Sequence, residues 1–206
     1  MKVIMLNGSP HAHGCTYTAL HEMEKVFCEE GIDCEIIPIA DRPVPGCTAC
    51  GACYKTGKCC FTDDKVNEVS KKFEQADALV LGSPVYYASA NGTICSFADR
   101  LFQISSFDKR FKLGAAVVSC RRGGASATFD QLNKYFTISG MPVVSSQYWN
   151  SVHGNTAEEV LQDREGLQVM RTLARNMSYL LRCIELGKQI YPLPEKEPRE
   201  RTNFIR

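Results

Sequence analysis

Lys-Val-Ile-Met-Leu-Asn-Gly-Ser-Pro-His-Ala-His-Gly-Cys-Thr, residues 2–16, opens with a short apolar run and continues into a loop rich in glycine, serine and proline. The apolar run over 2–6 predicts a buried β-strand, and a helical pattern begins just after the loop. A helix in this position directs its free backbone N–H groups and the positive end of its dipole at the loop. With the hydroxyls of Ser9 and Thr16, the stretch predicts a phosphate site.

This loop differs from two familiar phosphate-binding patterns. It lacks the Gly-Lys-Ser/Thr ending of a Walker A sequence, and it is not Gly-x-Gly-x-x-Gly. The second difference argues against a tightly held dinucleotide. A mononucleotide with one terminal phosphate therefore fits the loop better.

The composition sets limits on the class of protein. A chain of 206 residues with 44% hydrophobic content predicts one large domain with a real core. Its formal net charge of +1 predicts no binding to nucleic acid or to an acidic membrane surface. We also expect no membrane-spanning helix and no signal peptide. An odd count of 11 cysteines favours a reducing cytoplasm, where thiols are ligands or buried apolar groups.

Apolar strands alternate with helical patterns along the chain. We expect five strands, over residues 2–6, 33–39, 78–81, 113–119 and 142–145. We expect helices over residues 18–30, 63–75, 94–105, 125–138 and 156–188. The alternation predicts an α/β domain over 1–190 with a parallel sheet covered on both faces. The charged, proline-containing segment 191–206 lacks a core-forming pattern and is predicted to be a tail.

Three loops rich in glycine, serine or proline follow predicted strands, at residues 8–15, 83–92 and 119–124. The carboxyl ends of parallel strands meet at one edge of a sheet, and ligands bind there where the strand order reverses. The three loops therefore predict a single site.

Together these loops resemble those of the flavodoxin-like NAD(P)H-dependent FMN reductases, over about residues 1–188. The resemblance implies a three-layer flavodoxin-like sandwich with strand order 2-1-3-4-5, bound FMN and NAD(P)H as a transient donor. The implied phosphate contacts are Ser9, His11, Cys15, Thr16 and Tyr17. The implied contacts to the isoalloxazine ring are Pro84, Val85, Tyr86, Tyr87, Cys120, Arg121, Gly123 and Gly124. The family commonly has Arg where this chain has His11, and Asn where it has Cys15.

A cysteine-rich loop over 41–61 follows the second predicted strand. Cys47, Cys50 and Cys53 stand at three-residue steps, and Cys59 follows six residues later. Such spacing suits a four-iron four-sulfur cluster better than zinc, which prefers two separated pairs. The motif is similar to that of the iron–sulfur flavoproteins, a branch of the same family. Spacing alone leaves two alternatives open: Cys60 in place of Cys59, and a loop without a cluster that contacts a second subunit.

The resemblance implies an FMN-dependent oxidoreductase whose flavin carries the chemistry, so no catalytic acid or base is expected. Electrons would pass from a reduced nicotinamide or protein donor to a quinone, flavin or nitroaromatic, or through a cluster to a ferredoxin-like protein. The family also implies a homodimer or homotetramer. Two rival hypotheses are a non-catalytic flavodoxin-type carrier, against which the net charge of +1 argues, and a cysteine-loop redox or metal sensor without flavin.

Overall fold

The first strand, β1 (Lys2–Asn7), lies inside a parallel sheet and faces two hydrophobic cores. Val3 and Met5 point into one core, and Ile4 and Leu6 point into the other. All four side chains are fully buried, as the two-residue period of a strand covered on both faces requires.

The computed structural model describes residues 1–198, 200, 202 and 204.

The sheet has the strand order expected for a flavodoxin-like fold. Its five parallel strands are arranged in the order β2 (Asp33–Pro38), β1, β3 (Ala78–Tyr86), β5 (Leu113–Cys120) and β6 (Ser151–His153). The two-residue strand β4 (Ser89–Ala90) pairs antiparallel to the end of β3. Apart from this short strand, the order 2-1-3-4-5 predicted from the sequence is confirmed.

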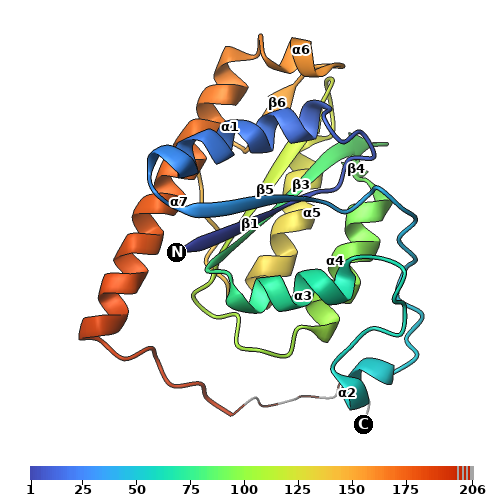
Figure 1. The fold of residues 1–206 in the computed structure, drawn as a ribbon, viewed down its shortest axis with the longest axis vertical. Coiled ribbons are helices and arrows are strands. Elements are labelled where there is room, and N and C mark those ends of the chain that lie inside the picture. The colour runs from blue at the N-terminus through green and yellow to red at the C-terminus, as the bar shows by residue number, and fades with distance from the viewer. Residues whose placement is uncertain (199, 201, 203, 205–206) are drawn as a thin grey trace.

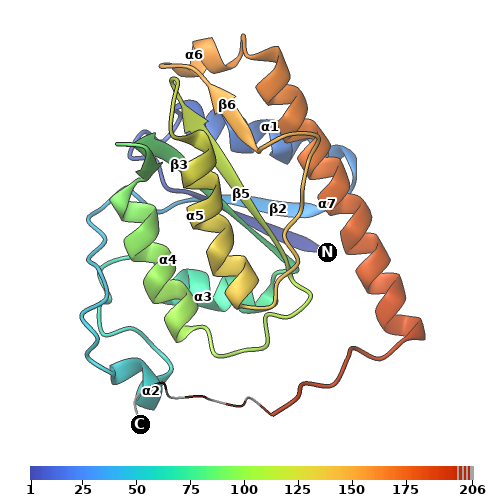
Figure 2. The ribbon, with the colours of Figure 1, turned by 180° about the vertical axis from the view of Figure 1, so that it is seen from behind.

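Helices cover both faces of the sheet (Figures 1 and 2). One face is covered by α1 (Cys15–Glu29), α6 (Ala157–Val160) and α7 (Arg164–Ile190). The other face is covered by α3 (Val66–Gln75), α4 (Gly92–Ile104) and α5 (Ala125–Ile138). The short helix α2 (Ala52–Thr56) belongs to the cysteine-rich segment and lies beside the far end of α4 (Figure 1).

Two predicted elements were wrong. The segment 142–145 is not a strand, because only Val143 forms an isolated bridge to Gly114. The fifth strand is β6, where Asn150 donates to the Ala116 carbonyl at 3.1 Å and brings the chain beside β5. The helix expected over 156–188 is two helices, because Asp163 accepts from the Gly166 N–H at 2.9 Å and starts α7 anew.

Other boundaries moved by a few residues. Helix α1 begins at Cys15 instead of residue 18, and β3 continues to Tyr86 because it pairs with β5 and then β4. After α7 ends at Ile190, the described residues form no helix or strand, and part of the predicted tail 191–206 lies outside the described residues. Within the described residues, no helix combines the length and apolar character needed to cross a membrane.

Candidate functional site

The first loop leaves β1 at the carboxyl edge of the sheet and packs tightly against β3. The Gly8 N–H donates to the Gly82 carbonyl at 2.9 Å, and a Cβ on Gly8 would lie only 2.8 Å from that oxygen. The loop also folds on itself, because the side chain of buried Asn7 accepts from the Ser9 N–H at 3.0 Å. Glycine at position 8 is thus required by the close approach of this loop to the backbone of β3.

Helix α1 begins directly behind this loop. Its N-cap residue, Gly14, offers no side chain to the first-turn N–H groups. The first turn of an α-helix has no intrahelical acceptors for these donors, which carry the positive end of the helix dipole. The loop and the uncapped helix start together fit the terminal phosphate of a mononucleotide.

The two hydroxyls predicted to bind phosphate, those of Thr16 and Ser9, make hydrogen bonds within the protein. Thr16 is 1% exposed, and its hydroxyl lies 2.8 Å from that of Ser119 at the end of β5. The Ser9 hydroxyl accepts from the His11 N–H at 3.2 Å. The first contact ties the start of α1 to the end of β5, and the second ties the loop to itself. Neither contact uses the backbone N–H groups of the first turn of α1.

The other predicted phosphate contacts lie around the same loop. His11 is exposed, and the Cys15 thiol donates to the Gly154 carbonyl at 3.6 Å. Burial raises the pKa of the Cys15 thiol, so it stays protonated at neutral pH. Tyr17 is half-buried and stacks with the ring of His21, with 5.6 Å between the ring centroids.

The second loop is a hairpin between β3 and β4. Tyr87 and Ala88 form its turn with φ values of 49° and 61°. Tyr87 is fully exposed and Tyr86 is 46% exposed, while Pro84 and Val85 are partly buried beneath them. The turn therefore presents an aromatic surface at the carboxyl edge of the sheet.

The third loop lies directly against this hairpin. Gly124 has φ of 89°, and a Cβ there would lie 2.6 Å from the Ala88 Cα and 2.8 Å from a Val85 methyl. Arg121 and Gly123 are more exposed, and Cys120 is buried, which raises the pKa of its thiol. The structure thus brings the three predicted loops together at one edge.

Asn91, which sequence analysis did not single out, ties the first and second loops. Its amide donates to the Gly8 carbonyl at 2.5 Å, and its backbone N–H donates to the Ser83 hydroxyl at 3.1 Å. Its side-chain oxygen also caps α4 by accepting from the Ile94 N–H at 2.9 Å. An asparagine just before a helical pattern predicts the cap, but the contact with Gly8 spans 83 residues.

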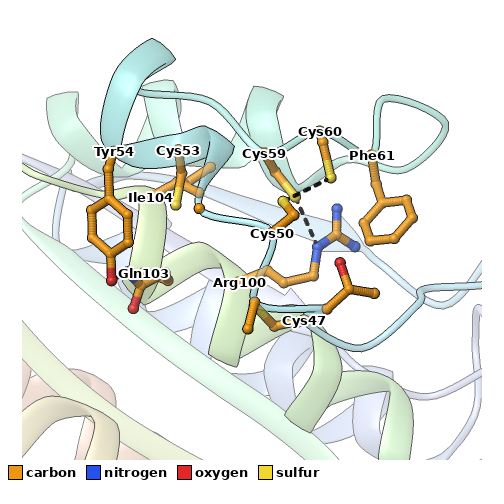
Figure 3. Close-up of a pocket in the computed structure, with 13 residues that line it drawn as sticks. Cys47, Cys50, Cys53, Tyr54, Cys59, Cys60, Phe61, Arg100, Gln103 and Ile104 are labelled. Atoms are coloured by element: carbon orange, nitrogen blue, oxygen red, sulfur yellow. Dashed lines mark hydrogen bonds between the residues drawn. The ribbon is translucent and has the colours of Figure 1, made fainter.

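The predicted cysteine ligands line a second site, a cavity of about 180 Å³ (Figure 3). Its walls include Cys47, Cys50, Cys53, Cys59, Cys60, Tyr54, Phe61, Arg100, Gln103 and Ile104. Across the described residues, no group of three or more histidine, cysteine or carboxylate side chains is placed to hold a single metal ion. Five cysteines line the cavity, and the Cys50 and Cys60 sulfurs come within 3.4 Å of each other there.

One thiol of this cavity, that of Cys50, has a lowered pKa. The backbone N–H of Ala52 and then the Cys60 thiol lower the pKa of Cys50. The Cys50 and Cys60 sulfurs are 3.4 Å apart, and this contact is the main reason that the pKa of Cys60 is raised. Because the thiolate is the metal-binding form, Cys50 is better prepared as a ligand than Cys60.

Cys59 is held more firmly than Cys60. Its backbone N–H donates to Asn67 at 2.8 Å, its carbonyl accepts from the same side chain at 3.1 Å, and its sulfur accepts from Arg100 Nε at 3.1 Å. Its side chain packs against the core beneath α3 and α4, whereas Cys60 is exposed.

The topology and the three loops at the switch of strand order define a flavodoxin-like α/β protein with a mononucleotide-type site. The fold is shared with a crystal structure of RosB with bound 8-demethyl-8-formylriboflavin 5'-phosphate, at a TM-score of 0.68 and 15% identity over 100% of this chain and 94% of that one. It is also shared with a flavodoxin from the domain Archaea, at a TM-score of 0.61 and 16% identity over 88% of this chain and 99% of that one.

The chain belongs to the NADPH-dependent FMN reductase family, whose model matches residues 1–156. It is 33% identical to an iron–sulfur flavoprotein of Methanocaldococcus jannaschii over 90% of this chain and 100% of the relative. It is 28% identical to an iron–sulfur flavoprotein of Methanosarcina thermophila over 91% and 99% of the two chains. The resemblance drawn from the sequence is confirmed, and FMN is the cofactor that the family supports.

Proposed function

We propose that this protein is an FMN-dependent oxidoreductase that takes electrons from NAD(P)H or a protein donor. Its acceptor would be a small molecule such as a quinone, flavin or nitroaromatic, or, through an iron–sulfur cluster, a ferredoxin-like carrier. The observation that carries the proposal is the meeting of three loops beside the uncapped start of α1. Bound FMN would supply the redox chemistry, by accepting electrons in one half-reaction and donating them in the other.

The protein's residues would bind and orient the flavin. The N–H groups at the start of α1 would hold the phosphate, with Ser9 and Thr16 bracing the loop from below. Tyr86 and Tyr87 offer aromatic faces for the ring. Arg121 is exposed on the adjoining loop and would supply positive charge at the edge of the ring, where negative charge accumulates on reduction.

A second redox centre is proposed in the cysteine cavity. Cys47, Cys50, Cys53 and Cys59 would ligate one four-iron four-sulfur cluster, and the firm hold on Cys59 favours it over the exposed Cys60. The odd count of 11 cysteines favours a reducing compartment, and we propose the cytoplasm.

Helix α4 links the two proposed centres. It is capped at the flavin loops by Asn91, and it reaches the cysteine cavity with Arg100 and Gln103. Arg100 lies nine positions after Asn91, which corresponds to roughly 14 Å along a helix axis. The helix would hold the two centres at a constant separation within one subunit.

The test is a visible spectrum of protein purified without oxygen, recorded before and after adding NADH or NADPH. We expect two flavin bands, a broad brown shoulder from a cluster, and bleaching of the flavin bands by one of the nucleotides. A colourless protein that takes up no added FMN contradicts the proposal. Flavin bands that resist both nucleotides but fall with a reduced ferredoxin-like protein would exclude nicotinamide as the donor.

A further inference from the structure

A buried arginine stands at the centre of the cysteine-rich segment. Arg100, from the C-terminal half of α4, is 1% exposed and forms an ion pair with Asp64, whose side chain is 2% exposed. Its guanidinium also donates to the Pro45 carbonyl at 3.2 Å and lies 4.9 Å from the centre of the Phe61 ring. Two separate stretches of the chain, one at Pro45 and one over residues 61–64, therefore converge on one cation.

The guanidinium directs one of its N–H groups at a sulfur. Its two terminal nitrogens, Nη1 and Nη2, contact Asp64, and this leaves Nε–H free to donate to the Cys59 Sγ atom at 3.1 Å (Figure 3). If Arg100 only attached this part of the chain to α4, its contacts with Asp64 and Pro45 would be enough. The contact with Cys59 brings positive charge and a fixed donor to a proposed ligand.

We propose that Arg100 is the positioning residue that holds Cys59 as a cluster ligand and raises the reduction potential of the cluster. This inference rests on the proposed cluster. Hydrogen bonds to ligand sulfurs and nearby positive charge favour the more negative, reduced state of an iron–sulfur centre. Asp64 has the opposite effect, because its buried carboxylate offsets part of the charge of Arg100. The pair thus contains one group that raises the potential and one that lowers it.

The opposite signs distinguish this role from a merely structural one. Arg100→Gln removes the charge, and Arg100→Lys keeps the charge but loses the planar fork that reaches both Asp64 and Cys59. Asp64→Asn keeps the arginine and removes the balancing carboxylate. Arg110→Gln, in an exposed pair with Asp108 outside the cysteine cavity, is the matched control.

The experiment measures iron and sulfide content and then the midpoint potential, in an anaerobic redox titration followed by electron paramagnetic resonance. Arg100→Gln is expected to lower the midpoint potential of the cluster by about 59 mV, which is a tenfold change in the equilibrium of a one-electron couple. Arg100→Lys should lie between this variant and the native protein, Asp64→Asn should shift the potential upward, and Arg110→Gln should leave it unchanged.

Each other result counts against a definite claim. An iron-loaded Arg100→Gln protein with the native midpoint overturns the role of Arg100 and leaves the proposed cluster standing. Shifts of the same sign in Arg100→Gln and Asp64→Asn, or loss of iron from all three cavity variants, reduce the pair to a structural bracket. A native protein without iron overturns the proposed cluster and this inference together.

Discussion

Adding one methyl group to Gly124 should separate two of the flavin loops. Its φ of 89° costs a non-glycine residue about 1–3 kcal/mol. The new Cβ would also lie 2.6 Å from the Ala88 Cα, and ordinary van der Waals contact begins at 3.4 Å. The loops must therefore move apart by about 0.8 Å. The crowded atom, Ala88 Cα, is a backbone atom of a tight turn, so it cannot move aside as a flexible side chain could. We expect Gly124→Ala to lower the free energy of unfolding by about 2 kcal/mol or more.

The neighbouring glycine provides a matched control. A Cβ on Gly123 would meet no atom within 4 Å, and its φ is not positive. We expect Gly123→Ala to leave stability unchanged or to raise it by up to about 1 kcal/mol, because alanine restricts the unfolded chain.

The assay is urea unfolding of the flavin-free proteins together with fluorescence titration of FMN. Gly124→Ala should weaken FMN binding at least tenfold, which is about 1.4 kcal/mol, because it displaces the hairpin that carries Tyr86 and Tyr87. An equal loss of unfolding free energy in Gly123→Ala and Gly124→Ala would contradict this prediction, since a Cβ is crowded only at position 124.

Three further predictions concern other parts of the molecule. Asn91→Asp keeps the cap of α4 but cannot donate to the Gly8 carbonyl. We expect a stability loss of about 1–3 kcal/mol and weaker FMN binding in calorimetry. Native FMN affinity would contradict a role for the contact between Asn91 and Gly8. Burial, and then Cys28, raise the pKa of Cys34 to about 12, so the folded state favours the neutral thiol. The urea midpoint should therefore fall as pH rises above about 9 and toward 12. Cys34→Ala should make this fall smaller. Sedimentation at micromolar concentration should show at least a dimer, and a species of 22.9 kDa alone would reject the homo-oligomer.

The first strand and its loop could be predicted because their structure follows from local chemistry. A run of four apolar residues from Val3 specifies a strand buried on both faces, and the glycine of the following turn permits a close approach. The short strand β6 was missed because Ser-Val-His holds one apolar residue, and its place depends on hydrogen bonds between Asn150 and β5. Pairing with a neighbouring strand outweighed local hydrophobicity there.

The candidate sites show the same division. Spacing alone predicts Cys47, Cys50 and Cys53 as cluster ligands, because their separation in the chain is itself the evidence, and this stays a prediction. The preference for Cys59 came from Asn67 and Arg100, the second of which lies 41 residues away. An aspartate just before a helical pattern favours a helix cap, and the Asp64 carboxylate accepts from the Val66 N–H, but its main partner is Arg100. Contacts over such distances cannot be inferred from one sequence without its fold.

This chain is proposed to carry two separate redox centres, a flavin at the strand ends and a cluster in the cysteine cavity. We would test for both centres by measuring FMN, iron and sulfide in anaerobically purified native protein and in Cys50→Ser. We predict about one FMN and about four irons per chain in the native protein, with the iron lost and the FMN kept in the variant. Native protein with full FMN and no iron would contradict the claim and reduce the cysteine-rich segment to a structural element.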